Sequence, residues 1–138
     1  MKFNDFIKKG MVRKASKDVA LSRSLVKNAK KDLIFLRGLE VNENSARKVM
    51  VGYYDVLRSV LEAISALEGY KVYSHEAFSY FLRERNEENL AIKFDRFRKI
   101  RNSINYYGED ISFLDVKEIV IGIEKDIDYL TDRYLGEI

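Results

Sequence analysis

Apolar residues recur every three or four positions along most of the chain, a spacing that places them on one side of an α-helix. No segment alternates apolar and polar residues over the length of a convincing strand. The predicted long helices cover residues 15–36, 45–68, 86–107 and 112–134, and the predicted short ones cover residues 3–9 and a segment opening at Ser74. The 45–68 helix has apolar residues on two sides, so we expect it to be the most buried.

Serine and glycine residues mark the predicted helix ends. Ser74 and Ser112 are candidate N-caps, because a serine side chain can accept a hydrogen bond from a free backbone N–H of the first turn. The glycines that fall where the apolar periodicity stops are Gly10, Gly38, Gly69, Gly108 and Gly136. Gly52 and Gly122 lie inside helical patterns instead, which predicts close approach of a neighbouring helix at both positions.

The fold class follows from this order of helices. The chain of 138 residues has no proline to interrupt them, and 46% of its residues are hydrophobic, enough for one core. We therefore predict an all-α fold, an antiparallel up-and-down bundle of four long helices plus short helices. Residues 1–138 are expected to form a single domain, with residues 1–10 as a short N-terminal helix or arm.

Composition excludes several kinds of site. The chain has no cysteine and one histidine, His75, so it lacks a thiol nucleophile, thiolate metal ligands and any multi-histidine metal centre. We accordingly expect no metal and no cofactor. Because no apolar run is long enough for a membrane span or a signal peptide, we expect a cytoplasmic domain without a membrane partner.

Charge is distributed unevenly, although the net charge is only +3. Residues 1–31 carry +8, residues 32–108 carry +1 and residues 109–138 carry −6. A basic end can attract phosphate-rich partners. The alternatives are that the two ends pack side by side and neutralise each other, or that the charges simply face water.

The 86–107 helix ends in a run of cations that includes Arg98 and Arg101. Arg98, Arg101 and Asn105 are spaced so that they share one face of this helix. Arg101 also lies beside the apolar stripe, so we expect it to be half-buried and to need an anionic or carbonyl partner. The 45–68 helix offers the carboxylates of Asp55 and Glu62 as partners, and an external anion is the alternative.

Asp55, Arg58 and Glu62 form a polar stripe across the otherwise apolar 45–68 helix. Polar stripes on a buried helix are typical of a cleft or a subunit contact. The sequence therefore predicts that these three residues support whatever Arg101 binds.

The stretch Arg101-Asn102-Ser103-Ile104-Asn105-Tyr106-Tyr107, near the end of a late helix, resembles the signature of the HEPN superfamily of small prokaryotic helical domains. In that signature an arginine, commonly followed by asparagine, precedes a histidine a few residues later. Other parts of residues 11–135 agree with the family, namely Met11-Val12-Arg13-Lys14, Tyr53 and Tyr54, and residues 69–77 before the short helix.

The resemblance implies a function and a set of partners. HEPN domains form homodimers whose motifs face one another across a cleft. Many are metal-independent RNA-cleaving toxins, and their usual antitoxin is a minimal nucleotidyltransferase. On this basis the expected catalytic residues are Arg101, Asn102 and Tyr106, the expected RNA- or nucleotide-binding residues are Arg98, Arg101, Asn105 and Tyr107, and the supporting residues are Asp55, Arg58 and Glu62.

The chain departs from the family at the histidine. Tyr106 stands where the histidine is expected, and tyrosine is a poor base at neutral pH. Gly108 stands where some toxins of the family carry a tyrosine that the partner modifies. His75 could fill the gap if the fold brings it near Arg101. Otherwise it begins its helix beside Ser74, facing water or packed against a tyrosine.

Three functional hypotheses remain. The first is a homodimeric HEPN-like module of a toxin–antitoxin or defence-type system, which binds RNA or nucleotide at the Arg-Asn cleft with weak or no cleavage. The second is an active metal-independent endoribonuclease toxin neutralised by a nucleotidyltransferase antitoxin. The third is a structural role as the helical partner of a nucleotidyltransferase. The missing histidine favours the first and third hypotheses over the second.

Overall fold

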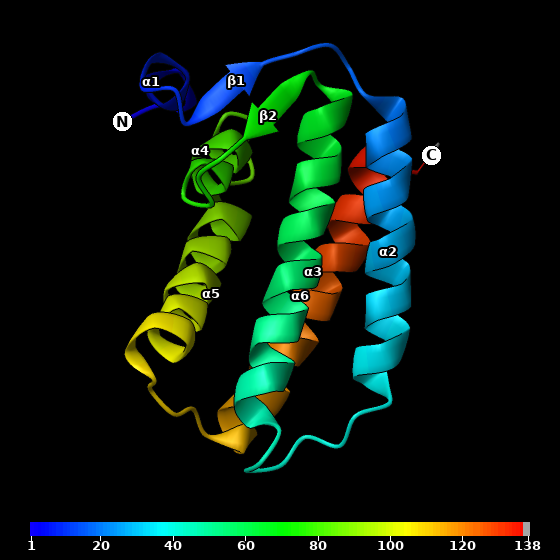
Figure 1. The fold of residues 1–138 in the computed structure, drawn as a ribbon, viewed down its shortest axis with the longest axis vertical. Coiled ribbons are helices and arrows are strands. Elements are labelled where there is room, and N and C mark those ends of the chain that lie inside the picture. The colour runs from blue at the N-terminus through cyan, green and yellow to red at the C-terminus, as the bar shows by residue number, and fades with distance from the viewer. Residues whose placement is uncertain (137–138) are drawn as a thin grey trace.

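The computed structural model describes residues 1–136 of the chain. Its helices are α1 (Phe3–Lys8), α2 (Val19–Arg37), α3 (Ala46–Leu67), α4 (Ala77–Arg83), α5 (Glu88–Tyr107) and α6 (Phe113–Tyr134), and its strands are β1 (Val12–Lys14) and β2 (Tyr70–Val72). The long helices α2, α3, α5 and α6 run alternately down and up the molecule (Figure 1). The described part of the chain is therefore predominantly helical, as the periodicity predicts.

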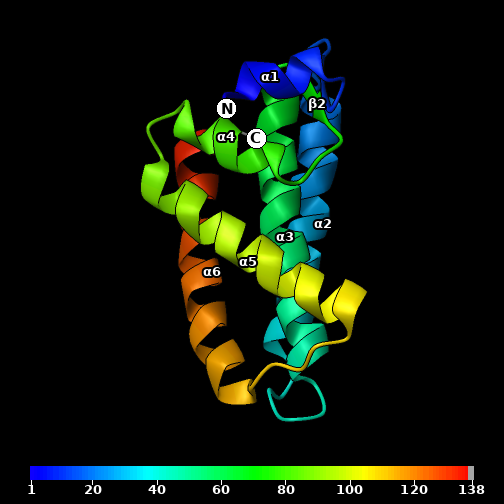
Figure 2. The same cartoon turned by 90° about the vertical axis from the view of Figure 1, so that its left-hand side faces the viewer.

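The central element is α3, which packs against α2, α5 and α6. Figure 2 shows α5 crossing α3 obliquely. Tyr54, Leu57 and Leu61 of α3 are each 0% exposed, and burial of one such leucine stabilises the fold by about 1.5–3 kcal/mol. The second apolar side of α3 is thus covered within the chain, so that side is not left open for a second copy.

Helix boundaries follow the predicted signals in three of the long helices. The ends of α3 lie one residue inside the predicted limits, and α6 ends at the predicted Tyr134. At the start of α6, Ser112 Oγ accepts a hydrogen bond from the Leu114 N–H at 3.2 Å, as the candidate cap predicts. Gly108 ends α5 in the left-handed conformation, with a φ of 64°. Local capping chemistry therefore marks the start of α6 and the end of α5.

Two predicted helix starts are wrong. The first long helix begins at Val19 rather than near residue 15, because the Asp18 carboxylate accepts a hydrogen bond from the Leu21 N–H at 2.9 Å and caps it there. The short helix begins at Ala77, and the Ser74 side chain does not cap it. Instead, the backbone carbonyl of Ser74 accepts a hydrogen bond from the Ala77 N–H at 3.1 Å.

The expectation that no strand is present is also wrong, because β1 and β2 form an antiparallel ladder. Each strand has only three residues, too few to display an alternating pattern. Backbone bonds extend the ladder at both ends, from Tyr73 N–H to the Met11 carbonyl and from Ala15 N–H to the Gly69 carbonyl, each at 2.8 Å. Gly69 has a φ of 82°, and a Cβ there would lie 2.7 Å from the Ala15 oxygen, so this corner requires glycine.

The two interior glycines behave differently. A Cβ on Gly52 would lie 2.7 Å from a Leu36 methyl carbon, which confirms the predicted close approach, here between α2 and α3. A Cβ on Gly122 would meet no atom within 4 Å, so the predicted close approach at that position is wrong.

The basic and acidic ends do not neutralise each other by direct pairing. Within residues 1–136, no cation of residues 1–31 forms an ion pair within 4.0 Å. The acidic α6 instead pairs with other parts of the chain, through Arg37 with Glu124 at 2.8 Å and Lys93 with Asp126 at 2.6 Å.

Among residues 1–136, no helix combines the length and the apolar character needed to cross a membrane.

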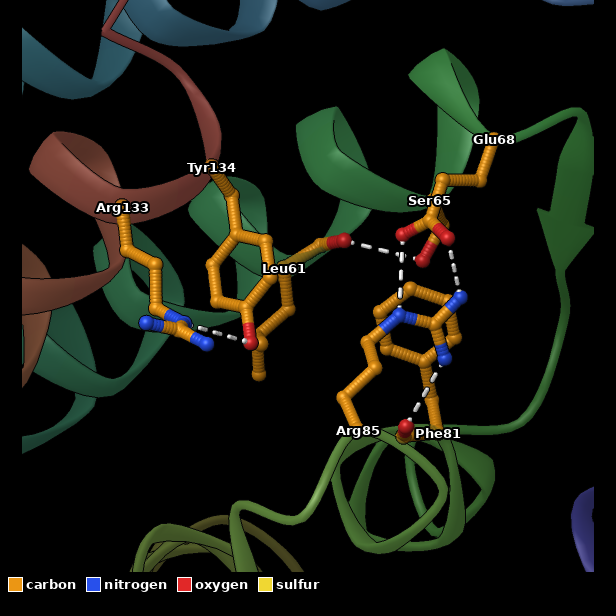
Figure 3. Close-up of polar contacts among 7 residues, drawn as sticks. All are labelled: Leu61, Ser65, Glu68, Phe81, Arg85, Arg133 and Tyr134. Atoms are coloured by element: carbon orange, nitrogen blue, oxygen red, sulfur yellow. Dashed lines mark hydrogen bonds and ion pairs between the residues drawn. The ribbon is translucent and has the colours of Figure 1, made fainter.

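Arg85, just beyond α4, connects that helix to the end of α3 (Figure 3). Its guanidinium binds both carboxylate oxygens of Glu68, with Nε donating at 2.9 Å, and Nη1 donates to the Phe81 carbonyl at 2.9 Å. The guanidinium carbon lies 3.4 Å from the centroid of the Phe81 ring, which is 0% exposed. The charge of the Arg85 guanidinium is therefore paired, and its N–H groups find acceptors, within the chain.

Candidate functional site

The end of α5 and the loop between β2 and α4 line an open pocket of about 440 Å³. Its lining residues are Tyr73, Ser74, His75 and Glu76 from the loop and Arg98, Arg101, Asn102 and Tyr106 from α5. The β1–β2 ladder holds the start of this loop, and α4 holds its end. The pocket thus joins the predicted Arg-Asn motif to the segment that carries the chain's histidine.

Arg101 is half-buried, as its position beside the apolar stripe predicts. Its guanidinium carbon lies 5.6 Å from the ring centroid of Tyr54 and 5.8 Å from that of Tyr106, both within cation–π range. Its Nη1 donates to Asn102 Oδ1 at 3.3 Å and to Tyr106 Oη at 3.5 Å. Its Nε is buried and has no hydrogen-bond partner within residues 1–136.

Two carboxylates of α3 and α5 pair with other arginines. Glu62 pairs with Arg58 at 3.1 Å, and Asp95 pairs with Arg98 at 2.8 Å. Among residues 1–136, no carboxylate lies within 4.0 Å of the Arg101 guanidinium, so neither predicted internal partner, Asp55 nor Glu62, pairs with it. Its guanidinium therefore has no ion-pair partner within residues 1–136.

His75 lines the same pocket and contacts Tyr54 of α3, with Nδ1 lying 3.0 Å from the tyrosine oxygen. Burial, and then the positive charges of Arg58, Arg101 and Arg98, lower the pKa of His75 to about 4. The imidazole is therefore neutral at pH 7. Burial also raises the pKa of Tyr54, so its hydroxyl remains protonated.

Only part of the predicted site lies in the pocket. Arg98, Arg101, Asn102 and Tyr106 line it, whereas Asn105 and Tyr107 are exposed and are not among the lining residues. The predicted supporting residues Asp55, Arg58 and Glu62 lie on α3, and Arg58 acts electrostatically on His75. Of the two alternatives for His75 at the start of its segment, water or a tyrosine, the structure shows the tyrosine, which is Tyr54. Glu76 and Tyr73 were not predicted as pocket residues.

The pocket suits an anion better than a metal. Within the described residues no three metal-ligating side chains come together. The pocket contains one carboxylate, Glu76, against Arg98 and Arg101, and Arg98 is already paired. A separate pocket of about 390 Å³ is lined by the carboxylates of Glu109, Asp110, Asp115 and Glu118, which would repel a phosphate.

Exposed aromatic rings surround the unpaired charge. Tyr73 is 58% exposed and Tyr106 is 70% exposed, and both line the pocket. Such rings can stack on a nucleobase, while a guanidinium binds phosphate oxygens through parallel hydrogen bonds. No family model matches the chain, and neither the curated proteins nor the solved structures give a match.

Proposed function

We propose that the protein binds RNA or a nucleotide in the pocket at the end of α5, with weak or no cleavage. The observation that carries this proposal is the half-buried guanidinium of Arg101, which faces an open pocket without a carboxylate partner among the described residues. An unpaired charge in this setting is costly unless a ligand or water compensates it. Phosphate oxygens provide that compensation, and Asn102 and the exposed tyrosines add polar and stacking contacts.

The same site supports binding more than catalysis. Strand scission without a metal needs a base for the 2′-hydroxyl and an acid for the leaving oxygen. Tyr106 replaces the histidine of the HEPN-like motif and only accepts a hydrogen bond from Arg101, at 3.5 Å. His75 is the alternative base, and its Nδ1 is already occupied by Tyr54.

The proposal includes a HEPN-like homodimer in a toxin–antitoxin or defence-type system, with a minimal nucleotidyltransferase as partner. Tyr106 and Tyr107, 70% and 78% exposed, lie at the end of α5 where a second copy would complete the cleft. Light scattering should give about twice the chain mass of 16.2 kDa. A monomeric mass would remove the dimer from the proposal, and a negative pull-down with a neighbouring nucleotidyltransferase would remove that partner.

The experiment that tests binding compares Arg101→Ala with Arg96→Ala, which makes the same charge change on the same helix outside this pocket. The probe is a short oligouridylate, titrated at several salt concentrations. Arg101→Ala should weaken binding at least about tenfold and reduce the salt slope by about one, whereas Arg96→Ala should stay within about twofold of the native protein.

Equal effects of the two substitutions would mean that the contact is a diffuse charge effect, and the proposed site would be wrong. Incubation with a folded RNA should leave it largely intact. Clear cleavage that Arg101→Ala abolishes would replace the binding function by the ribonuclease alternative.

A further inference from the structure

The imidazole of His75 has one nitrogen occupied and one open. Nδ1 lies 3.0 Å from Tyr54 Oη. Nε2 has no hydrogen-bond partner among the described residues, yet it is not one of the buried unpaired atoms there, which are Arg101 Nε and Asp126 Oδ2. Nε2 therefore reaches solvent, and because His75 lines the Arg101 pocket, this nitrogen is available to a ligand in that pocket.

Tyr54 decides which nitrogen carries the proton. Tyr54 is 0% exposed, and His75 is the only hydrogen-bond partner of its hydroxyl within residues 1–136. If Nδ1 carried the proton and donated it to the tyrosine oxygen, the tyrosine proton would be buried without an acceptor, which is costly. If Tyr54 donates to Nδ1, the buried tyrosine proton has its acceptor, and the imidazole proton lies on Nε2, which reaches solvent.

We propose that His75 is a phosphate-binding residue that acts as a neutral donor through Nε2–H beside the Arg101 guanidinium, and that Tyr54 is the positioning residue that fixes this tautomer. The inference rests on the proposed function and adds to it the second group that holds the phosphate. A donor at Nε2 has no lone pair for a 2′-hydroxyl proton, so the same arrangement disfavours cleavage.

The groups around the ring keep it neutral. Helix α3 contributes Tyr54, Asp55 and the Arg58–Glu62 pair. Helix α5 contributes Arg101 and the Arg98–Asp95 pair. The apolar Phe78 belongs to α4, and Glu76 follows His75 in the loop. Within this set, the charges that act on the ring are those of Arg58, Arg101 and Arg98, and they oppose its protonation together with burial. Binding should therefore be independent of pH from about 8 to about 6, because a neutral donor neither gains nor loses a proton in that range.

Nitrogen-15 NMR of the full chain at pH 7 tests the tautomer directly. The expected spectrum has His75 neutral, with the proton on Nε2 and an unprotonated Nδ1. A proton on Nδ1, or a charged ring at pH 7, would overturn the proposal whatever any variant does.

Two substitutions at position 75 test the contact with phosphate. His75→Gln keeps an N–H donor at similar reach, whereas His75→Leu removes it. We expect His75→Leu to weaken oligouridylate binding about tenfold and His75→Gln to stay within about threefold. Uridine monophosphate, measured in parallel, shows whether a terminal phosphate or an internal phosphodiester is the better ligand. Affinities unchanged in both variants would overturn the inference and leave the proposed function intact, whereas no binding of either probe by the native protein would overturn both.

Tyr54→Phe tests the positioning role. The ring stays neutral in this variant, because burial and the three arginines that lower its pKa are unchanged. Without the tyrosine hydroxyl, however, nothing selects between the two neutral tautomers, so nitrogen-15 NMR at pH 7 should show the proton shared between Nδ1 and Nε2, and oligouridylate binding should weaken about twofold to threefold. A proton still wholly on Nε2 in this variant, with its circular dichroism unchanged, would show that Tyr54 has only a structural role.

Discussion

Two arginines of this protein lie against aromatic rings, and they differ in what satisfies their charge. Arg85 has both oxygens of Glu68, a backbone carbonyl and the buried ring of Phe81 (Figure 3). Arg101 has a neighbouring amide, a tyrosine hydroxyl and no carboxylate among the described residues. A satisfied guanidinium stabilises the fold, whereas an unsatisfied one at the edge of a pocket is free to bind a ligand.

The largest difference in the free energy of unfolding is expected between substitutions of the two rings, Phe81 beside Arg85 and Tyr106 beside Arg101. Phe81 is 0% exposed, so Phe81→Ala should lower the free energy of unfolding by about 3–5 kcal/mol, because it leaves a cavity beneath Arg85. Tyr106 is 70% exposed, so Tyr106→Ala should change it by less than about 0.5 kcal/mol. Urea unfolding of both variants checks this, and a comparable loss in Tyr106→Ala would mean that the Arg101 region is part of the core.

The second-largest difference in stability is expected between substitutions of the two arginines. Arg85→Ala should cost about 1.5–2 kcal/mol of stability, since it removes a two-point ion pair and a stacked guanidinium at a partly solvated site. Arg101→Ala should be neutral within about 0.5 kcal/mol, since it breaks no ion pair. Thermal unfolding at equal salt measures the two, and similar costs would erase the distinction between a structural and a ligand-binding arginine.

Acid should weaken the fold through His75. Its pKa of about 4 in the folded chain lies below the ordinary value of 6.5, so the unfolded chain binds more protons between these values. The contribution is present above about pH 6.5 and is lost as the pH falls toward 4. For a half-exposed ring this amounts to about 1 kcal/mol. Urea unfolding at pH 7 and pH 4.5 should show a smaller loss in His75→Gln than in the native protein. Equal losses would contradict the depressed pKa.

The smallest effect is expected from Glu76, the single carboxylate that lines the pocket. Glu76→Gln should strengthen oligouridylate binding about twofold to threefold, because it removes a negative charge beside the phosphate in a solvated setting. Glu84→Gln makes the same charge change just after α4, outside this pocket, and should have no effect. An equal gain in both variants would point to net charge rather than to position.

Most of the fold could be predicted from sequence because helical periodicity and capping are local. The α3 limits and the Ser112 cap depend on residues within one turn of each other. The β1–β2 ladder could not be predicted, because its strands are short and depend on pairing between distant segments. The absence of a steric neighbour at Gly122 depends likewise on how whole helices pack.

Only the part of the candidate site that lies on α5 could be predicted from the sequence. The spacing of Arg98, Arg101 and Asn105 indicated a common face of α5, and of these Arg98 and Arg101 line the pocket whereas Asn105 does not. Asn102 and Tyr106, which also line it, were indicated by the motif and not by the spacing. The pairing of His75 with Tyr54 joins a loop to α3, and no periodicity relates the two. Likewise, Glu62 prefers Arg58, one turn away on its own helix, and this local pair leaves Arg101 free.

The β1–β2 ladder also bears on how fast a ligand can be captured. Tyr73, the first pocket residue of the loop, donates its backbone N–H to the Met11 carbonyl, so this end of the loop is held to the ladder when the chain folds. The entropic cost of ordering these residues then falls on folding and not on ligand association. For the proposed phosphate ligand this predicts association without a preceding rearrangement at Tyr73.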